Sequence, residues 1–240
     1  MRPKADPALA PVIDAAAGRF AGSNRFNRHF AHGKLSGDPV YLGLLKHKLL
    51  PSQGRLLDLG CGQGILLSLL LTAREFAEQG QWPETWPKPP AGLQLHGFER
   101  RPNMIRAARL ALADQAVIDS TDLRTSPLPA CRAVVLLDVL HYMSAEEQRD
   151  LLQKVALALE PGGVLLMREG DAGAGLSYGF TFVAEHLAAL LRCQFRQGFH
   201  FRSQREWVNL LKRLGFFVET LPMDEGTPFA NVLYVARRAV

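Results

Sequence analysis

One segment, residues 56–64, constrains the fold of this chain more than any other feature of its sequence. It begins with an apolar run interrupted only by Asp58, and Gly60, Gly62 and Gly64 follow at alternate positions. An apolar run that ends in glycines is typical of a buried strand that turns tightly into a helix. The first amides of such a helix commonly bind a ligand. The segment therefore predicts a strand–turn–helix corner beside a small ligand.

Strand-like and helix-like segments alternate after this corner. We expect strands at residues 55–59, 93–98, 116–118, 133–137 and 164–167. We expect helices at residues 65–78, 102–112, 144–159 and 203–214. This alternation predicts a parallel sheet with helices on both faces. Two last strands, at 216–221 and 232–236, have no helix between them and predict an antiparallel hairpin. The fold class is α/β, a doubly wound seven-stranded mixed sheet.

The chain divides into two parts in this interpretation. Residues 1–50 form an N-terminal helical cap, with two or three helices between positions 20 and 50, and residues 51–240 form the main domain. Two stretches of the main domain, at about 79–92 and 170–198, interrupt the alternation of strands and helices and are interpreted as insertions. The first is rich in Trp and Pro, and the second is expected to hold a helix over 180–191.

Composition limits the possible partners. The formal net charge is +5, but the basic residues are scattered, which argues against a nucleic-acid surface. Cys61, Cys131 and Cys193 lie far apart and predict reduced thiols rather than a zinc or redox site. The N-terminus lacks the apolar core of a signal peptide, and no apolar stretch is long enough to span a membrane. We expect a soluble cytoplasmic protein.

The glycine turn narrows the choice of ligand. A dinucleotide site needs a third glycine where this chain has Ile65, and a phosphate-binding P-loop needs a Gly-Lys-Ser/Thr sequence that is absent. Asp58 would repel a pyrophosphate, but it suits a ligand that carries an ammonium group. S-adenosyl-L-methionine (SAM) has such a group and no phosphate.

The segment from Asp58 to Gly64 resembles the first motif of class I SAM-dependent methyltransferases. The resemblance extends over about residues 50–238 and implies that SAM is the cofactor. It implies that Glu99 accepts hydrogen bonds from the ribose hydroxyls, with Arg100 beside it. It also implies that Asp122, beside Leu123, accepts from the adenine amino group. Asp119 is the alternative to Asp122, because the end of its strand is uncertain by a few residues.

Further segments match the same family in order. Asp138-Val139-Leu140-His141-Tyr142 resembles the segment that flanks the transferable methyl group. Pro161-Gly162-Gly163 resembles the turn before the fifth strand, and the terminal hairpin resembles an inserted antiparallel seventh strand. The expected cofactor site is Asp58, Gly60, Cys61, Gly62, Gly64, Glu99, Arg100, Asp122, Leu123 and Asp138, with Arg28 of the cap near the methionine carboxylate.

A second resemblance concerns the acceptor of the methyl group. Residues 30–41 and 226–233 are similar to bacterial methyltransferases encoded near enzymes of fatty-acid-like aryl polyene synthesis. That resemblance implies a biosynthetic role and an aromatic or polyene acyl acceptor, either a small molecule or a group held on a carrier protein.

His141, Tyr142 and Glu169 are the candidate catalytic residues. An imidazole titrates near neutral pH, so His141 could take a proton from a hydroxyl or phenol nucleophile, and Tyr142 could orient the substrate. Glu169 follows the fifth strand, where open α/β sheets bind ligands, and is an alternative base. Arg168 could hold an anionic group of the substrate. The competing interpretations are that His141 and Tyr142 only line the pocket and that the charges near position 169 pair with one another.

Three other functions stay open from the sequence. One is a SAM-binding sensor or partner subunit without transferase activity. Another is an RNA or protein methyltransferase, although no Asn-Pro-Pro-Tyr-type tetrapeptide is present. The third is a nucleotide-dependent oxidoreductase, which Ile65 opposes. Methyl transfer from a sulfonium needs no metal, so we expect none.

Overall fold

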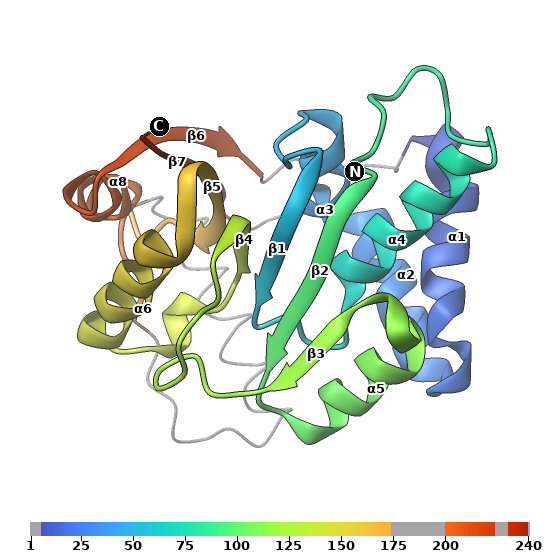
Figure 1. Ribbon diagram of the computed structural model, residues 1–240, viewed down its shortest axis with the longest axis horizontal. Helices are drawn as coiled ribbons and strands as arrows, with labels where there is room; N and C mark the ends of the chain where they lie inside the picture. The colour runs from blue at the N-terminus through green and yellow to red at the C-terminus, as the bar shows by residue number, and fades with distance from the viewer. Residues whose placement is uncertain (1–5, 174–199, 224–229, 240) are drawn as a thin grey trace.

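A seven-stranded sheet forms the centre of the molecule in the computed structural model, which describes residues 6–173, 200–223 and 230–239 (Figure 1). The strands are β1 (Gln53–Leu59), β2 (Gly92–Glu99), β3 (Val117–Ser120), β4 (Cys131–Leu137), β5 (Leu159–Gly170), β6 (Phe216–Pro222) and β7 (Asn231–Arg238). Their order is β3-β2-β1-β4-β5-β7-β6. The first five run parallel, and β7 lies antiparallel between β5 and β6. The predicted mixed sheet is confirmed.

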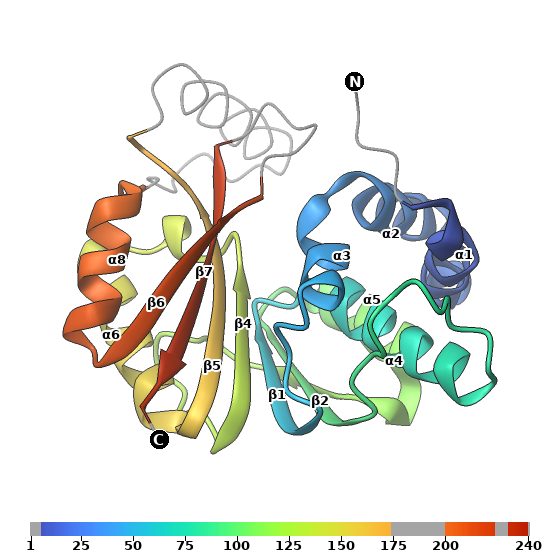
Figure 2. The ribbon, with the colours of Figure 1, turned by 90° about the horizontal axis from the view of Figure 1, so that it is seen from above.

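Helices cover both faces of this sheet (Figures 1 and 2). One face carries α4 (Ile65–Glu78) and α5 (Pro102–Leu112), with α1 (Ala10–Gly18), α2 (Arg25–Gly37) and α3 (Pro39–Lys46) on the same side. The other face carries α6 (Ala145–Ala158) and α8 (Gln204–Arg213). Short 3₁₀ turns lie at Pro7–Leu9, Arg19–Gly22, Ala113–Gln115 and Leu140–Tyr142. Among the described helices, none is long and apolar enough to cross a membrane.

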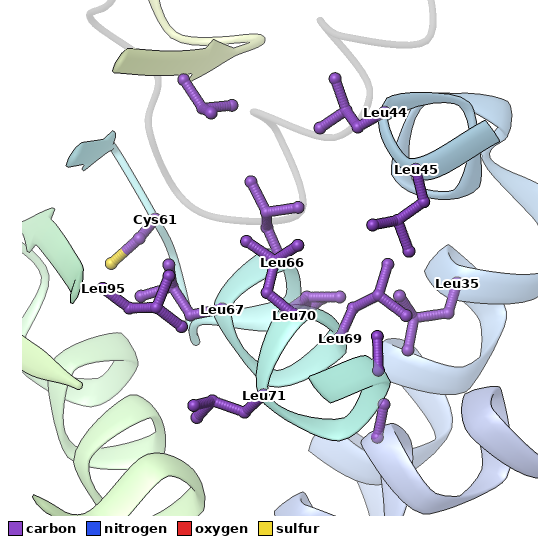
Figure 3. Close-up of a cluster of buried hydrophobic side chains, with 14 of the residues drawn as sticks. Leu35, Leu44, Leu45, Cys61, Leu66, Leu67, Leu69, Leu70, Leu71 and Leu95 are labelled. Atoms are coloured by element: carbon purple, nitrogen blue, oxygen red, sulfur yellow. The ribbon is translucent and has the colours of Figure 1, made fainter. Parts of the chain in front are cut away.

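The first nine residues of helix α4 are apolar except for Ser68 and Thr72, and this part of the helix is enclosed on all sides. Every residue from Ile65 to Ala73 is buried. Figure 3 shows its leucines packing in two directions, toward Cys61 and Leu95 of the sheet side and toward Leu35 and Leu45 of the cap. The helical cap thus completes the hydrophobic core on this side.

Local signals explain where the helices begin and end. Gly64 precedes α4 in a left-handed conformation, and Pro102 occupies the first turn of α5, where a missing N–H costs little. Ser144 and Glu147 form the predicted capping box of α6. The predicted bounds of α4 and α5 agree with the structure.

Two predictions of element bounds were wrong. Helix α1 lies before position 20, outside the range in which the helices of the cap were expected, and its proline stands at the first turn. Strand β5 begins at Leu159, so Pro161-Gly162-Gly163 continues the strand rather than preceding it. An irregular register opposite Cys131 accommodates these residues.

Of the two predicted insertions, the first lies wholly within the described residues and the second lies mostly outside them. The chain between α4 and β2 forms turns without helix or strand, and Trp82 and Trp86 pack against the core. The indole N–H of Trp86 donates to Asp6 at 2.8 Å. The expected helix over 180–191 lies outside the described residues, as does Cys193, whereas Cys61 and Cys131 are buried free thiols.

The parallel register brings the carboxyl ends of five strands to one edge. Leu59 of β1 is paired with Phe98 of β2, and Glu99 is paired with Ser120 of β3. On the other side of β1, Leu137 of β4 is paired with Arg168 of β5. The loops after these strands therefore meet, and they carry most of the candidate site.

Candidate functional site

A cavity of about 460 Å³ lies at this edge, between the loops after the strands and the helical cap. The glycine turn, the ends of β2 and β4 and the loop after β3 form one part of its wall. Helices α2 and α3 contribute the other part. Eight of the predicted cofactor residues line it: Gly60, Cys61, Gly62, Glu99, Arg100, Asp122, Leu123 and Asp138.

The turn itself requires glycine. Gly60 and Gly64 have φ angles of 80° and 82°, which side chains rarely adopt. A Cβ at Gly60 would lie 2.6 Å from a methyl group of Val139, and one at Gly64 would lie 2.8 Å from Leu112. Gly62, with φ of 59°, donates its backbone N–H to Glu99 at 3.1 Å. The turn is thereby pressed against both the β4 loop and α5.

Asp58 is buried next to this turn. Its side chain does not line the cavity, and the residue is only 4% exposed. Burial, together with the negative charge of Glu99, raises the pKa of the Asp58 carboxyl to about 7. A buried carboxylate with a raised pKa favours a cationic ligand, because a nearby positive charge would stabilise its ionised form.

Glu99 ends β2 and accepts several hydrogen bonds. Its oxygens accept from the backbone N–H groups of Arg100 and Arg101, each at 2.9 Å, and from the Arg101 guanidinium at 2.8 and 3.0 Å. Burial opposes ionisation of Glu99, but the bonds and charge of Arg101 outweigh it, so its pKa is lowered. Glu99 is therefore an ionised acceptor at neutral pH.

Asp122 has a similar arrangement after β3. Its carboxylate is paired with the guanidinium of Arg124 through contacts of 2.6, 2.9 and 3.2 Å. Hydrogen bonding to Arg124 lowers the pKa of Asp122 to about 2. The alternative, Asp119, lies within β3 and contacts His96 at 2.8 Å instead of lining the cavity. Of the two acids, Asp122 is the one at the candidate site.

The cap contributes different residues from the one predicted. Arg28 is exposed and is not among the residues that line the cavity, whereas Lys34 of the same helix does line it. Phe26 and Phe30 also line it, 72% and 44% exposed, with ring centroids 6.1 Å apart. Their spacing of four residues places Phe26, Phe30 and Lys34 on one face of α2, a signal that was available in the sequence.

The three candidate catalytic residues lie together. His141 Nδ1 is 2.7 Å from Glu169 Oε2, and the His141 and Tyr142 rings have centroids 4.1 Å apart. The other oxygen of Glu169 accepts from the backbone N–H groups of Val139 and Leu140. Tyr142 lines the cavity, while His141 and Glu169 are buried beside it. Glu169 therefore holds the loop after β4 and orients His141.

Arg168 and Glu169 lie within β5 rather than after it, and Arg168 does not line the cavity, contrary to the expectation that it could hold an anionic group of the substrate. It is 1% exposed and pairs with two carboxylates, those of Asp38 and Asp138. Burial opposes ionisation of Asp38, but the Arg168 charge lowers the pKa of Asp38 to about 2. Glu169 pairs with His141 rather than with Arg168.

Comparison with known proteins supports a family assignment. Residues 28–221 match a family model described as "Methyltransferase domain". The carboxy-S-adenosyl-L-methionine synthase of Chromohalobacter salexigens is 29% identical over 133 residues, which is 53% of this chain and 44% of that protein. The chain spans about half the length of the curated relatives it matches.

Solved structures share the fold. Human N-acetylserotonin methyltransferase, solved in complex with SAM, has a TM-score of 0.62 at 16% identity, with 98% of this chain and 60% of that chain covered. The [4+2]-cyclase SpnF has a TM-score of 0.60 at 17% identity, with 86% and 83% covered. At such identities the likeness concerns the arrangement of helices and strands.

Proposed function

The chain belongs to the methyltransferase-domain family, with S-adenosyl-L-methionine as its cofactor, and we propose that it transfers the cofactor's methyl group to a small-molecule or acyl-linked acceptor. The bound cofactor supplies a sulfonium, whose positive charge makes the methyl group electrophilic. The residues of this chain then have to bind the cofactor, exclude water and hold the acceptor atom in line with the carbon–sulfur bond.

One observation carries the proposal: the glycine turn, Glu99 and Asp122 line a single cavity. An ionised carboxylate is a natural acceptor for two ribose hydroxyls, which suits Glu99. Asp122, with Leu123, is the corresponding acceptor for the adenine amino group. Asp58, buried next to the turn, provides the negative charge that favours the ammonium of the methionine part.

Two arginines compete with the nucleoside for these acids. Arg101 and Arg124 each pair with the carboxylate two residues before them, Glu99 and Asp122. The Arg124–Asp122 pair is exposed on both sides, at 40% and 35%, and an ion pair of this kind is worth little in water, so the nucleoside can displace Arg124 easily. Glu99 is only 4% exposed and keeps its backbone hydrogen bonds from Arg100 and Arg101, so there the nucleoside has to displace the 41% exposed guanidinium of Arg101.

The acceptor side of the cavity favours an aromatic or long apolar group. Phe26, Phe30, Tyr142 and Met143 supply apolar and aromatic surface there. No Asp or Glu occurs within α2, whose exposed Arg25 and Arg28 add positive charge beside the aromatic pair. These features support an acceptor that is both apolar and anionic, such as an aromatic or acyl acid, free or attached to an acidic carrier protein.

His141 is the proposed general base where the acceptor atom must lose a proton. The contact between Nδ1 and Glu169 favours the tautomer with its proton on Nδ1, so Nε2 is the atom suited to receive a proton. The Tyr142 ring, whose centroid is 4.1 Å from that of His141, lines the cavity, and Tyr142 is proposed to orient the acceptor.

The test has a binding arm and a reaction arm. Calorimetry with S-adenosylhomocysteine should show binding that weakens at least tenfold in Asp58→Ala. Absence of binding by the unaltered protein would refute the proposal. Incubation with labelled SAM and a panel of aromatic acids and carrier-bound acyl groups, followed by mass spectrometry, should reveal a methylated product. Binding without any product across these acceptor classes would instead favour a SAM-binding protein that is not a transferase.

A further inference from the structure

Arg168 is a fully buried cation that joins two distant parts of the chain. Its Nε donates to Asp138 at 2.9 Å, and its second amino group donates to Asp38 at 3.0 Å. Two further, shorter contacts complete the pairing with both carboxylates. Asp38 lies in the helical cap and Asp138 lies at the end of β4, so one guanidinium spans the boundary between cap and sheet.

Each partner occupies a position that controls backbone geometry. Asp38 is the N-cap of α3, where it accepts from Val40 N–H at 3.3 Å, and it separates α2 from α3. Asp138 has a φ angle of 58°, which is unusual for a residue with a side chain, and its N–H donates to the carbonyl oxygen of Arg168 at 3.1 Å. Arg168 therefore fixes Asp138 through both its side chain and its backbone.

The charges form a chain whose ends reach the cavity. Lys34 donates to Asp38 at 3.1 Å, so positive and negative groups alternate from Lys34 through Asp38 and Arg168 to Asp138. Lys34 and Asp138 both line the cavity, and so does Tyr41 of α3. A shift of the cap relative to the sheet would therefore change the cavity wall on two sides.

Energetics favour a positioning role over a stabilising one. Removing the charges of Arg168 and Asp38 from water is costly, and a buried ion pair is weak evidence for added stability. Its bidentate geometry nevertheless specifies where the two carboxylates lie. A guanidinium is suited to this task because it presents fixed donors to two acids at once.

We propose that Arg168 is a positioning residue that fastens the helical cap onto the end of β4, so that the cofactor pocket is complete only while the Asp38–Arg168–Asp138 bridge is formed. The inference rests on the proposed function, because it takes this cavity to be the SAM site. It predicts that loss of the bridge weakens cofactor binding beyond what a general loss of stability would cause.

Arg19 provides a matched control. Its guanidinium also ties the cap to the main domain, donating to Thr72 at 3.1 Å and to Gln115 at 2.7 Å and pairing with Glu75. None of these four residues lines the cavity. Arg19→Met removes a cap contact of comparable complexity away from the site.

The experiment measures S-adenosylhomocysteine affinity, melting temperature and hydrogen exchange of residues 25–46 in full-length Arg168→Met, Asp38→Asn and Arg19→Met. Asparagine is itself a good N-cap, so Asp38→Asn removes the ion pair while α3 keeps its start, and it serves if Arg168→Met does not fold. We expect at least tenfold weaker binding and faster exchange in both bridge variants. Arg19→Met should lower the melting temperature with affinity unchanged within twofold.

The outcomes are separable. If the unaltered protein binds S-adenosylhomocysteine and both bridge variants bind it equally well, or if Arg19→Met loses as much affinity as they do, the inference is wrong. If the unaltered protein does not bind it, the proposed function fails first. Arg168→Lys should restore part of the affinity, because one ammonium can reach only some of the acceptor oxygens.

Discussion

At the scale of single residues, the charge of the Asp58 carboxylate is expected to favour binding of a cationic ligand but to destabilise the ligand-free protein. Burial and the charge of Glu99 raise its pKa from 3.8 to about 7 in the folded protein. The folded state therefore holds a proton between these values that the unfolded state has released. The contribution of Asp58 to stability is therefore greatest below about pH 4 and is lost as the pH rises to about 7. A bound cation would offset the cost of ionising the buried Asp58 carboxyl.

Asp58→Asn tests that opposition. At pH 8 we expect the ligand-free variant to be more stable by at most about 4 kcal/mol, because one pKa unit corresponds to about 1.4 kcal/mol. At pH 4 the two proteins should differ little. Urea unfolding at both pH values measures the effect. A variant that is less stable than the unaltered protein at pH 8 would contradict it.

His141 is the residue for which binding and turnover should separate. We expect His141→Ala to lower kcat by about 10²-fold or more, the usual contribution of a general base, with S-adenosylhomocysteine affinity kept within threefold. Steady-state kinetics with the acceptor identified by mass spectrometry, combined with calorimetry, would measure both quantities. Tyr142→Phe tests the neighbouring ring separately, since it removes a hydroxyl from the cavity and leaves the His141–Glu169 contact in place. Unaltered turnover in His141→Ala would show that His141 is not the general base.

Glu99 and Asp122 were expected at the site from the family resemblance, and the sequence left Asp119 open as the alternative to Asp122. Both Glu99 and Asp122 line the cavity because the ends of strands in a parallel sheet meet at one edge. Their arginine partners could not be predicted, since Arg101 and Arg124 look like ordinary surface residues until the turn geometry is known. Selection of Lys34 over Arg28 required the orientation of α2, which depends on how the cap packs.

At the scale of elements, α4 explains why the cap belongs to the core. The stretch of α4 from Ile65 to Ala73, which is buried on every side, needs a cover on the face turned away from the sheet, and α1 to α3 provide it. The bounds of α4 were predictable because Gly64 and the apolar run mark them locally. The course of β5 was not, because whether a Pro-Gly-Gly sequence ends a strand or continues it depends on the neighbouring strand.

Leu69→Ala tests the packing of α4. Leu69 is fully buried, and removing its side-chain methyl groups should cost about 2–5 kcal/mol through lost burial and the cavity left behind. Leu157→Ala on α6 is the control, because Leu157 is 74% exposed and its replacement should change stability by less than about 0.5 kcal/mol. Urea denaturation compares the two. Equal, small effects would mean that α4 can repack.

At the scale of the whole molecule, the fold is compatible with several reactions, and the residues of the site decide which of them the protein can catalyse. The same arrangement of strands and helices occurs in a SAM-bound methyltransferase and in a [4+2]-cyclase. Fold alone therefore does not identify a reaction. In this chain the proposed cofactor site uses acids at or near strand ends, and the proposed acceptor site uses Phe26, Phe30 and Tyr142, which line the cavity from the cap and from the β4 loop.

The division into a cap of residues 1–50 and a main domain of residues 51–240 stays a prediction that truncation can test. The buried cap residues, among them Leu9, Ile13, Phe20 and Leu44, belong to the same cluster as the leucines of α4. We expect a 51–240 fragment to expose that apolar helix face and to aggregate, as seen by size-exclusion chromatography and circular dichroism.

Full-length Phe26→Ser/Phe30→Ser is the control, because it alters the exposed surface of the cap and should keep the melting temperature. A monomeric fragment with a cooperative thermal transition would show that the cap is a separable domain. Aggregation would mean instead that one unit provides both the stability of the sheet and the wall of the pocket, so that acceptor specificity could not change through the cap without affecting folding.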